Sequence, residues 1–317
     1  MATYKEINGT NIQVVSSDPS NPLEGQLWYN TSTNKVKGFL VSSGTWATSN
    51  DLNNIRSELA GAGTQTAALA FGGEPVTAVT ESYNGTSWTE VNDLQLARED
   101  LAGAGTQTAA LAFGGLDGFD AKNETEVWNG SNWTEVNNIN TARGRWAGCG
   151  TTTAALGFAG YIGGVKNLTE LWNGTNWTAV NTMNNARQNL AGAGISTSAL
   201  AFGGSPVPAT SNTESWNGTN WTEVNDLNTP RKELSGSGTS NTNALAFGGG
   251  TPPVTGATEK WNGSNWTEVG DLNLARDDLA GCGSNTVALA FGGTSPDRTA
   301  ATEEFTAGPT TVTLSTS

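Results

Sequence analysis

Four acidic residues lie outside the repeating pattern of the chain and are the first candidates for chemistry: Glu74, Asp117, Asp120 and Asp297. Two carboxylic acids at a defined separation, one of them with a raised pKa, can hydrolyse a glycosidic bond. Each of the four follows a Gly-Gly pair and is expected in a loop, where a rigid scaffold commonly carries binding or catalysis. A carbohydrate-active enzyme that uses loop carboxylates is therefore one hypothesis.

The composition excludes several other kinds of chemistry. The 317 residues include no His and two Cys, with 15 Lys plus Arg against 29 Asp plus Glu and a net charge of -14. Without histidine, Ser-His-Asp and Cys-His catalysis and imidazole metal ligation are excluded. Two thiolates alone do not complete a structural zinc site. The sequence therefore predicts no cofactor and no metal.

The charge and hydropathy of the chain also limit its partners. A protein that binds a phosphate backbone needs a basic surface, so the acidic balance predicts no nucleic acid. No stretch approaches 18 consecutive apolar residues, which predicts no membrane insertion. The start of the chain lacks a basic segment followed by an apolar one, so we expect no signal peptide and assembly in the cytoplasm.

A repeat of about 44 residues organises the chain, and a period of this length is typical of propellers and solenoids. Tryptophans mark one position of the repeat: Trp46, Trp88, Trp133, Trp177, Trp221 and Trp266. Arginines mark another: Arg56, Arg98, Arg143, Arg187, Arg231 and Arg276. A Gly-Gly pair recurs about 16 residues after the arginine, with Ala159-Gly160 in its place once.

Within a unit, short apolar or alternating runs are separated by turns, and none has the 3.6-residue period of a helix. An Asn-Gly turn flanked by aromatic residues, as in Trp128 to Trp133, favours a tight hairpin. The pattern predicts an all-β fold, a six-bladed β-propeller of four-stranded blades. Because the sixth unit lacks its tryptophan strand, we expect the segment Gly44 to Ala47 to supply it and close the ring.

The repeat resembles the kelch family of β-propellers over residues 56 to about 306. The resemblance rests on the arginine that opens each unit, the small-residue strand, the Gly-Gly pair and the aromatic hairpin. The hairpin is tighter than in that family, since Tyr83 and Trp88 are only five positions apart. The resemblance implies a propeller but no function, because kelch-like domains bind proteins, bind glycans or carry enzymes.

The arginines and cysteines are interpreted as structural. Glutamates recur at the same period and predict one Arg–Glu pair in each unit, rather than a cationic ring for an anion: Glu81, Glu126, Glu170, Glu214, Glu259 and Glu303. Cys149 and Cys282 each lie six residues after an arginine, in a slot that is Ala or Ser in the other units. We therefore expect reduced packing residues and no disulfide.

The loop after the Gly-Gly pair differs in every unit and is the candidate binding face. Its candidate residues are Leu116, Asp117, Phe119, Asp120, Tyr161, Ile162, Pro206, Pro208, Pro252, Pro253, Asp297 and Arg298. We expect Phe119, Tyr161 and Ile162 to be exposed and to anchor a partner. The alternative is that these loops are unconstrained surface.

The segment from Asn21 to Phe39 contains Gly-Gln-Leu-Trp-Tyr-Asn-Thr and resembles a hairpin of bacteriophage tail-fibre and other virion proteins. With the repeats, it resembles propeller proteins of marine tailed phages. This resemblance implies an attachment segment at 1–34, a propeller at 35–317, and a non-enzymatic virion protein of tail-fibre, tail-associated or capsid-decoration type. Its expected partners are capsid or tail proteins and a host-surface glycan or protein. The alternatives are the carbohydrate-active enzyme and an intracellular kelch-like adaptor.

Overall fold

The computed structural model describes residues 12–19, 26–41, 44–118, 120–206, 208–250 and 253–314, and within them it is all β-strand, turn and loop. None of these residues belongs to a helix long and apolar enough to cross a membrane. The chain forms two compact units, which are described separately: a terminal unit of Met1–Gly44 with Ala307–Ser317, and a repeat region of Thr45–Thr306.

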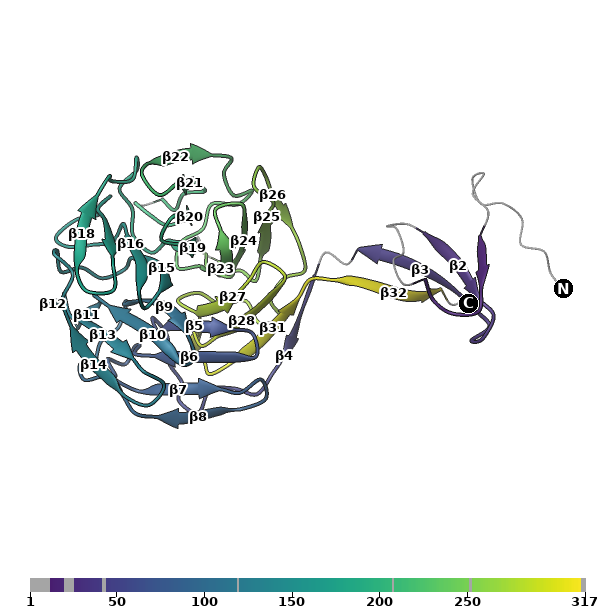
Figure 1. The fold of residues 1–317 in the computed structure, drawn as a ribbon, viewed down its shortest axis with the longest axis horizontal. Coiled ribbons are helices and arrows are strands. Elements are labelled where there is room, and N and C mark those ends of the chain that lie inside the picture. Colours follow the sequence, from purple (N-terminus) through teal and green to yellow (C-terminus); the bar gives the residue numbers. More distant parts are fainter. Residues whose placement is uncertain are drawn as a thin grey trace. The chain divides into compact units, whose positions relative to one another are not determined.

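The described part of the repeat region contains six antiparallel four-stranded sheets (Figure 1). The first two are β5 (Ala60–Thr64), β6 (Ala67–Phe71), β7 (Thr80–Tyr83) and β8 (Trp88–Val91), then β9 (Ala102–Thr106), β10 (Ala109–Phe113), β13 (Thr125–Trp128) and β14 (Trp133–Val136). The next two are β15 (Ala147–Thr151), β16 (Ala154–Phe158), β17 (Thr169–Trp172) and β18 (Trp177–Val180), then β19 (Ala191–Ile195), β20 (Ser198–Phe202), β21 (Thr213–Trp216) and β22 (Trp221–Val224). The last two are β23 (Ser235–Ser240), β24 (Asn243–Phe247), β25 (Thr258–Trp261) and β26 (Trp266–Glu268), then β27 (Ala280–Gly283), β28 (Val287–Phe291), β31 (Thr302–Thr306) and β4 (Thr45–Thr48).

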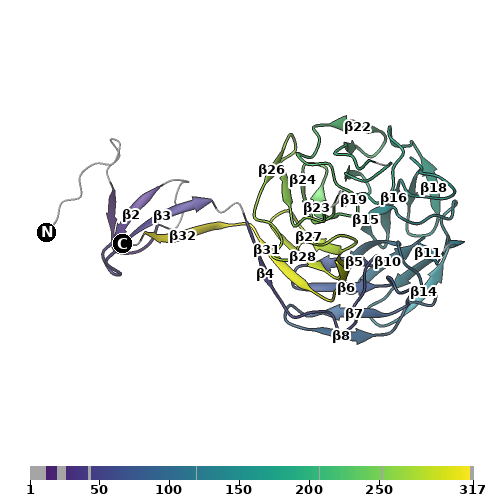
Figure 2. The ribbon, with the colours of Figure 1, turned by 180° about the vertical axis from the view of Figure 1, so that it is seen from behind.

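The six sheets share one plan, which is that of a β-propeller-like repeat. The first strand of each sheet lies near the centre and the fourth lies at the rim, an order that Figure 2 shows from behind. In the last sheet the fourth strand is β4, from the start of the region, and its Trp46 pairs with Phe305 of β31. The predicted all-β architecture of four-stranded units is therefore confirmed.

Small residues in the first strand let neighbouring sheets approach closely. The first strand alternates Ala with Gly, and the second strand, such as Ala67–Phe71, is buried along most of its length. A Cβ on Gly61 would lie 2.6 Å from the Phe291 ring of the adjacent sheet. The aromatic side chains of one sheet therefore fill the space that the glycines of the next leave open.

Each repeat tryptophan joins two sheets, and all of them except Trp46 also close a hairpin within their own sheet. Trp133 pairs across the hairpin with Trp128, and its ring centroid lies 5.0 Å from that of Phe71 in the preceding sheet. Its indole Nε1 donates to the Thr80 hydroxyl, also in the preceding sheet, at 3.0 Å. The same bond is made at 3.0–3.2 Å by Trp46, Trp88, Trp177, Trp221 and Trp266. The tryptophans therefore fix the spacing between sheets.

The terminal unit contains a four-stranded sheet of its own, in the order β1 (Gln13–Val15), β2 (Leu27–Asn30), β3 (Lys35–Val41) and β32 (Pro309–Leu314). The boundary lies at Gly44 rather than at residue 34, because β3 pairs with β2 and β32 instead of joining a repeat. The Asp18 carboxylate accepts hydrogen bonds from Lys37, Trp28 and Asn30, which lower its pKa to about 2. This network ties the loop after β1 to the hairpin.

Candidate functional site

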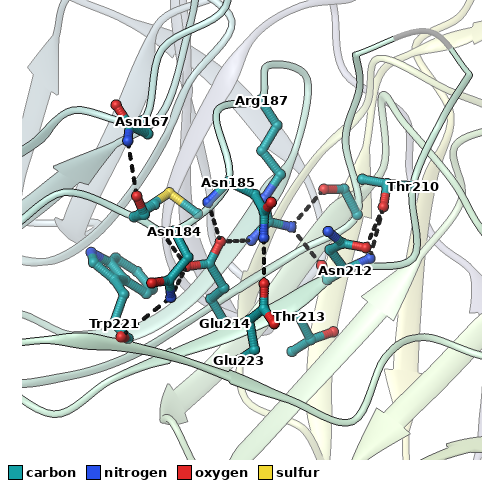
Figure 3. Close-up of polar contacts among 12 residues, drawn as sticks. Asn167, Asn184, Asn185, Arg187, Thr210, Asn212, Thr213, Glu214, Trp221 and Glu223 are labelled. Carbon is teal, nitrogen blue, oxygen red and sulfur yellow. Dashed lines mark hydrogen bonds and ion pairs between the residues drawn. The ribbon is translucent and has the colours of Figure 1, made fainter.

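The repeated arginines form buried ion pairs. Arg187 donates to Glu214 at 2.9 Å and to the carbonyl of Gly203 at 3.0 Å, while Asn184 donates to the other Glu214 oxygen (Figure 3). The other five predicted pairs are present too: Arg56–Glu81, Arg98–Glu126, Arg143–Glu170, Arg231–Glu259 and Arg276–Glu303. The arginine side chains are at most 1% exposed. They cannot meet a dissolved anion, so their role is structural.

The two cysteines occupy the small-residue slot of the central strands. Cys149 pairs with Leu156 in register, as Ala62 pairs with Leu69 in the first repeat. Both Cys149 and Cys282 are free and buried. Burial raises the pKa of each thiol to about 12, which leaves the side chains protonated and unreactive at neutral pH.

Two residues after each arginine, the chain forms what we call the polar ring: Glu58, Asp100, Arg145, Asn189, Glu233 and Asp278. All six have a left-handed backbone, with φ between 52° and 58°. Each backbone N–H donates to the carbonyl of the preceding member, and Glu58 donates to Asp278, at 2.8–3.0 Å. This cyclic hydrogen bonding brings the six polar side chains around one small pocket of about 100 Å³.

The polar ring carries more negative charge than its cations neutralise. Arg145 pairs with Asp100 at 3.0 Å, and Lys232 pairs with Glu233 at 2.5 Å. Burial, followed by the charges of Asp100 and other acids, raises the pKa of Glu58 to about 7. Burial and then Glu233 raise the pKa of Asp278 to about 9. Crowding of carboxyl groups therefore favours their protonated forms.

One group of acids in the described residues has the spacing of a cation site. Carboxylate oxygens of Glu233, Asp277 and Asp278 lie within 4.8 Å of one another, and oxygen ligands suit Ca²⁺ or Mg²⁺. The Lys232 ammonium already binds Glu233, so a lysine of the chain supplies positive charge to this group of acids.

Beside the polar ring lies a larger hollow of about 910 Å³, which we call the loop cleft. It is lined by three consecutive repeats, and the charged or large side chains are Glu58, Glu74, Glu99, Leu116, Asp120, Lys122, Arg145, Tyr161 and Ile162. Backbone bridges between Glu99 and Leu116, and between Gly144 and Tyr161, hold the variable loops against the segments after the arginines. The cleft is therefore built on a fixed backbone.

The structure brings together only part of the predicted binding residues. Asp120, Tyr161 and Ile162 line the loop cleft, and Tyr161 is 37% exposed. Leu116 also lines the cleft, but its side chain is only 6% exposed because it packs over Gly144. Leu116 therefore supports the cleft and is too buried to contact a partner. The remaining described residues do not line this cleft, although Asp117 and Arg298 pair with Lys122 and Glu74, which do: Asp117, Pro206, Pro208, Pro253, Asp297 and Arg298. Phe119 and Pro252 lie outside the described residues.

The four loop acids first considered for catalysis do not all converge on one site, although Glu74 and Asp120 both line the loop cleft. Asp117 lies opposite Asp120 across a small hairpin, β11 (Leu116–Asp117) and β12 (Asp120–Ala121), and binds Lys122. Glu74 pairs with Arg298, whose neighbour Asp297 lines a separate hollow of about 530 Å³. The acids with raised pKa belong instead to the polar ring and to Glu99 and Asp277 beside it.

The polar ring was not predicted, although the sequence contains a signal for it. Its six members lie at one offset from the arginine, all are polar, and a leucine or Trp146 follows each one. What the sequence could not supply is the left-handed backbone that turns them toward a shared pocket.

Comparison with protein-family models finds no match for this chain, and comparison with curated proteins finds none. Its function must therefore be argued from its own residues.

Proposed function

We propose that this protein is a non-enzymatic structural protein of a tailed-phage virion, in which a closed six-bladed kelch-like propeller presents its variable loops to a host-surface partner. The terminal unit, with the hairpin of β2 and β3, attaches it to the capsid or tail. The virion assignment rests on the resemblance of the Asn21 to Phe39 segment and of the repeats to phage proteins.

The closed ring is supported by contacts that run from the last sheet back to the first. The central strands follow one another from β5 to β27, and β27 contacts β5. The Trp88 indole of the first sheet donates a hydrogen bond to the Thr302 hydroxyl of the last sheet. The backbone N–H of Glu58 donates to the carbonyl of Asp278. A closed ring leaves only the short outer strand of each sheet, such as β8, as a free edge, which suits a protein that must stay monodisperse when exposed on a particle.

The loop cleft carries the proposal that this face recognises a partner. The loop residues that line the cleft differ from those of the other repeats, whereas the strands that carry the loops repeat. Binding proteins commonly combine variable loops with a constant, rigid scaffold in this way. The cleft volume of about 910 Å³ falls in the usual range of ligand sites, about 300–1,000 Å³.

Two measurements test the proposal. Mass spectrometry and antibody labelling of purified virions should detect this chain on the particle, and its absence there would refute the virion role. In cell-binding assays, the recombinant protein should lose binding when residues 161–166 are replaced by the loop 205–210 of the fourth repeat. The exposed rim substitution Glu268→Gln is the control and should leave cell binding unchanged.

A second candidate function is favoured by one observation, the raised pKa of Glu58 beside Asp100. A glycosidase needs one protonated carboxyl group as general acid and a second carboxylate as base or nucleophile. Assays on a panel of aryl glycosides test this candidate. Hydrolysis that is lost in Glu58→Gln and kept in Glu268→Gln would favour the enzyme over the binding protein.

A further inference from the structure

The loop cleft contains carboxylates that the rest of the chain does not neutralise. Glu99 is 9% exposed, and its carboxylate makes no hydrogen bond or ion pair with the residues that the structure describes. Glu58 and Asp120, on the same cleft, also have no side-chain partner in the described chain. A largely buried carboxylate without a partner, as at Glu99, is costly, so an incoming cation gains more there than at an exposed acid such as Asp120.

The cations around the cleft are already engaged. Arg145 binds Asp100 at 3.0 Å, and Lys122 lies 3.4 Å from Asp117. Arg298, near the edge of the cleft, binds Glu74. The charge left over on the cleft is therefore negative, from Glu99 and Asp120, and Glu58 adds to it as the pH rises through its pKa of about 7.

An aromatic ring completes the site. Tyr161 is 37% exposed, and the guanidinium carbon of Arg145 lies 5.8 Å from its ring centroid. Tyrosine rings attract guanidinium and ammonium groups at this distance, and a neighbouring carboxylate adds a charge-assisted hydrogen bond. Ile162, also exposed, supplies apolar surface for the aliphatic part of a side chain.

Comparison among the repeats shows that the fold does not require a carboxylate where Glu99 stands. The equivalent positions hold Ser57, Gly144, Gln188, Lys232 and Asp277. All of them share the same backbone frame after the buried arginine. The acid that lines the cleft together with Tyr161 is therefore a feature of this cleft rather than of the scaffold.

We propose that the loop cleft binds a basic segment of a protein partner, with an arginine or lysine side chain held between Glu99 and the ring of Tyr161. The inference rests on the proposed function, since it names the chemistry of the partner that the loop face recognises. The cleft has room for a few residues of such a segment.

The test uses the full chain and two short probes, acetyl-Gly-Arg-Gly-amide and the same peptide with citrulline, the uncharged isostere of arginine. Binding is followed by ¹⁵N-amide NMR titration at low salt. The arginine peptide should shift the amides of Glu99, Tyr161 and Gly163, and its affinity should fall as salt is added. The citrulline peptide should bind at least tenfold more weakly.

Variants separate a specific site from general attraction to an acidic protein. Glu99→Gln should weaken the arginine peptide about tenfold, Tyr161→Ala should weaken it severalfold, and Tyr161→Phe should keep the affinity within about twofold. The matched control, Glu268→Gln, removes one exposed carboxylate from the rim and should change nothing. Melting curves of all variants verify that they fold.

The proposal is overturned if the citrulline peptide binds equally well, or if Glu268→Gln weakens binding as much as Glu99→Gln. A glucosamine trimer that shifts the same amides more tightly than the arginine peptide would assign the cleft to a glycan and also overturn it. Because the titration needs no virion, its failure is distinguishable from absence of the chain on particles.

Discussion

The substitution Glu58→Gln is expected to stabilise the protein at alkaline pH and to leave it unchanged at acid pH. Glu58 belongs to the polar ring, and burial together with Asp100 and Glu99 raises its pKa from 4.5 to about 7, against the opposing charge of Arg145. A carboxyl group with a raised folded-state pKa binds its proton more tightly in the folded state. Its contribution to stability is therefore fully present below pH 4.5 and is lost as the pH rises through about 7.

The size of the effect follows from that shift. For a fully enclosed group, a pKa shift from 4.5 to about 7 corresponds to about 3 kcal/mol in the free energy of unfolding. Water at the mouth of the pocket screens the charge of Glu58 and reduces this to about 1–2 kcal/mol. Glutamine keeps the shape of the side chain without the charge. At pH 9 the variant should therefore melt about 3–5 °C above the parent protein, while at pH 4 the two should agree within about 1 °C.

Differential scanning calorimetry across pH 4 to 9 measures this, with Glu268→Gln as the exposed control that should follow the parent at every pH. A Glu58→Gln variant that melts lower than the parent at pH 9 would refute the reasoning. An equal increase at both pH values would refute it too, because the gain would then not come from ionisation.

Three further predictions concern the scaffold. Arg187→Met leaves Glu214 buried without its cation and should cost about 3–5 kcal/mol in urea unfolding, whereas the double variant Arg187→Met with Glu214→Leu should cost less; equal losses would contradict a paired role. Cys149→Ala should change the stability by less than about 1 kcal/mol, since alanine fills this slot in three other repeats, and Ellman's reagent should modify neither thiol until the protein unfolds. Gly103→Ala sets a Cβ 2.8 Å from the Phe71 ring and should cost about 1–3 kcal/mol, while Gly308→Ala, with nothing within 4 Å, should be neutral; similar losses would contradict the packing argument.

The repeated part of the fold was predictable because its period exposes which residues act together. Arg187 and Glu214 recur at one period, and the structure pairs them. The aromatic residues Tyr83 and Trp88 were expected across one hairpin, and their ring centroids lie 4.9 Å apart. Their second role was not predictable: the Trp88 indole reaches Thr302 of another sheet, and a bond between positions 214 residues apart leaves no local pattern.

The terminal unit and the loop cleft were less predictable for a different reason. Strand β3 reads like a continuation toward the repeats, and only its pairing with β32 from the other end of the chain assigns it to the terminal unit. Leu116 looked like a contact residue because it stands in a variable loop, yet it is buried over Gly144 of the next repeat, at a position where no other repeat has glycine. Contacts between non-repeated residues are set by packing, which a periodic pattern does not encode.

The positions after each arginine explain how one short segment can serve both the scaffold and a partner. The arginine and the leucine three residues later are buried in the first repeat, as Arg56 and Leu59, and their types recur except where Trp146 replaces leucine. Between them, the two intervening residues bond through backbone atoms, as at Glu99 and Asp100. Because these hydrogen bonds use only backbone atoms, they tolerate almost any side chain. The charge at these two positions can therefore change without disturbing the buried Arg–Glu ion pairs. The scaffold holds equally well with Ser57, Gly144 or Lys232 at the position of Glu99, so the acid at Glu99 is not required by the fold.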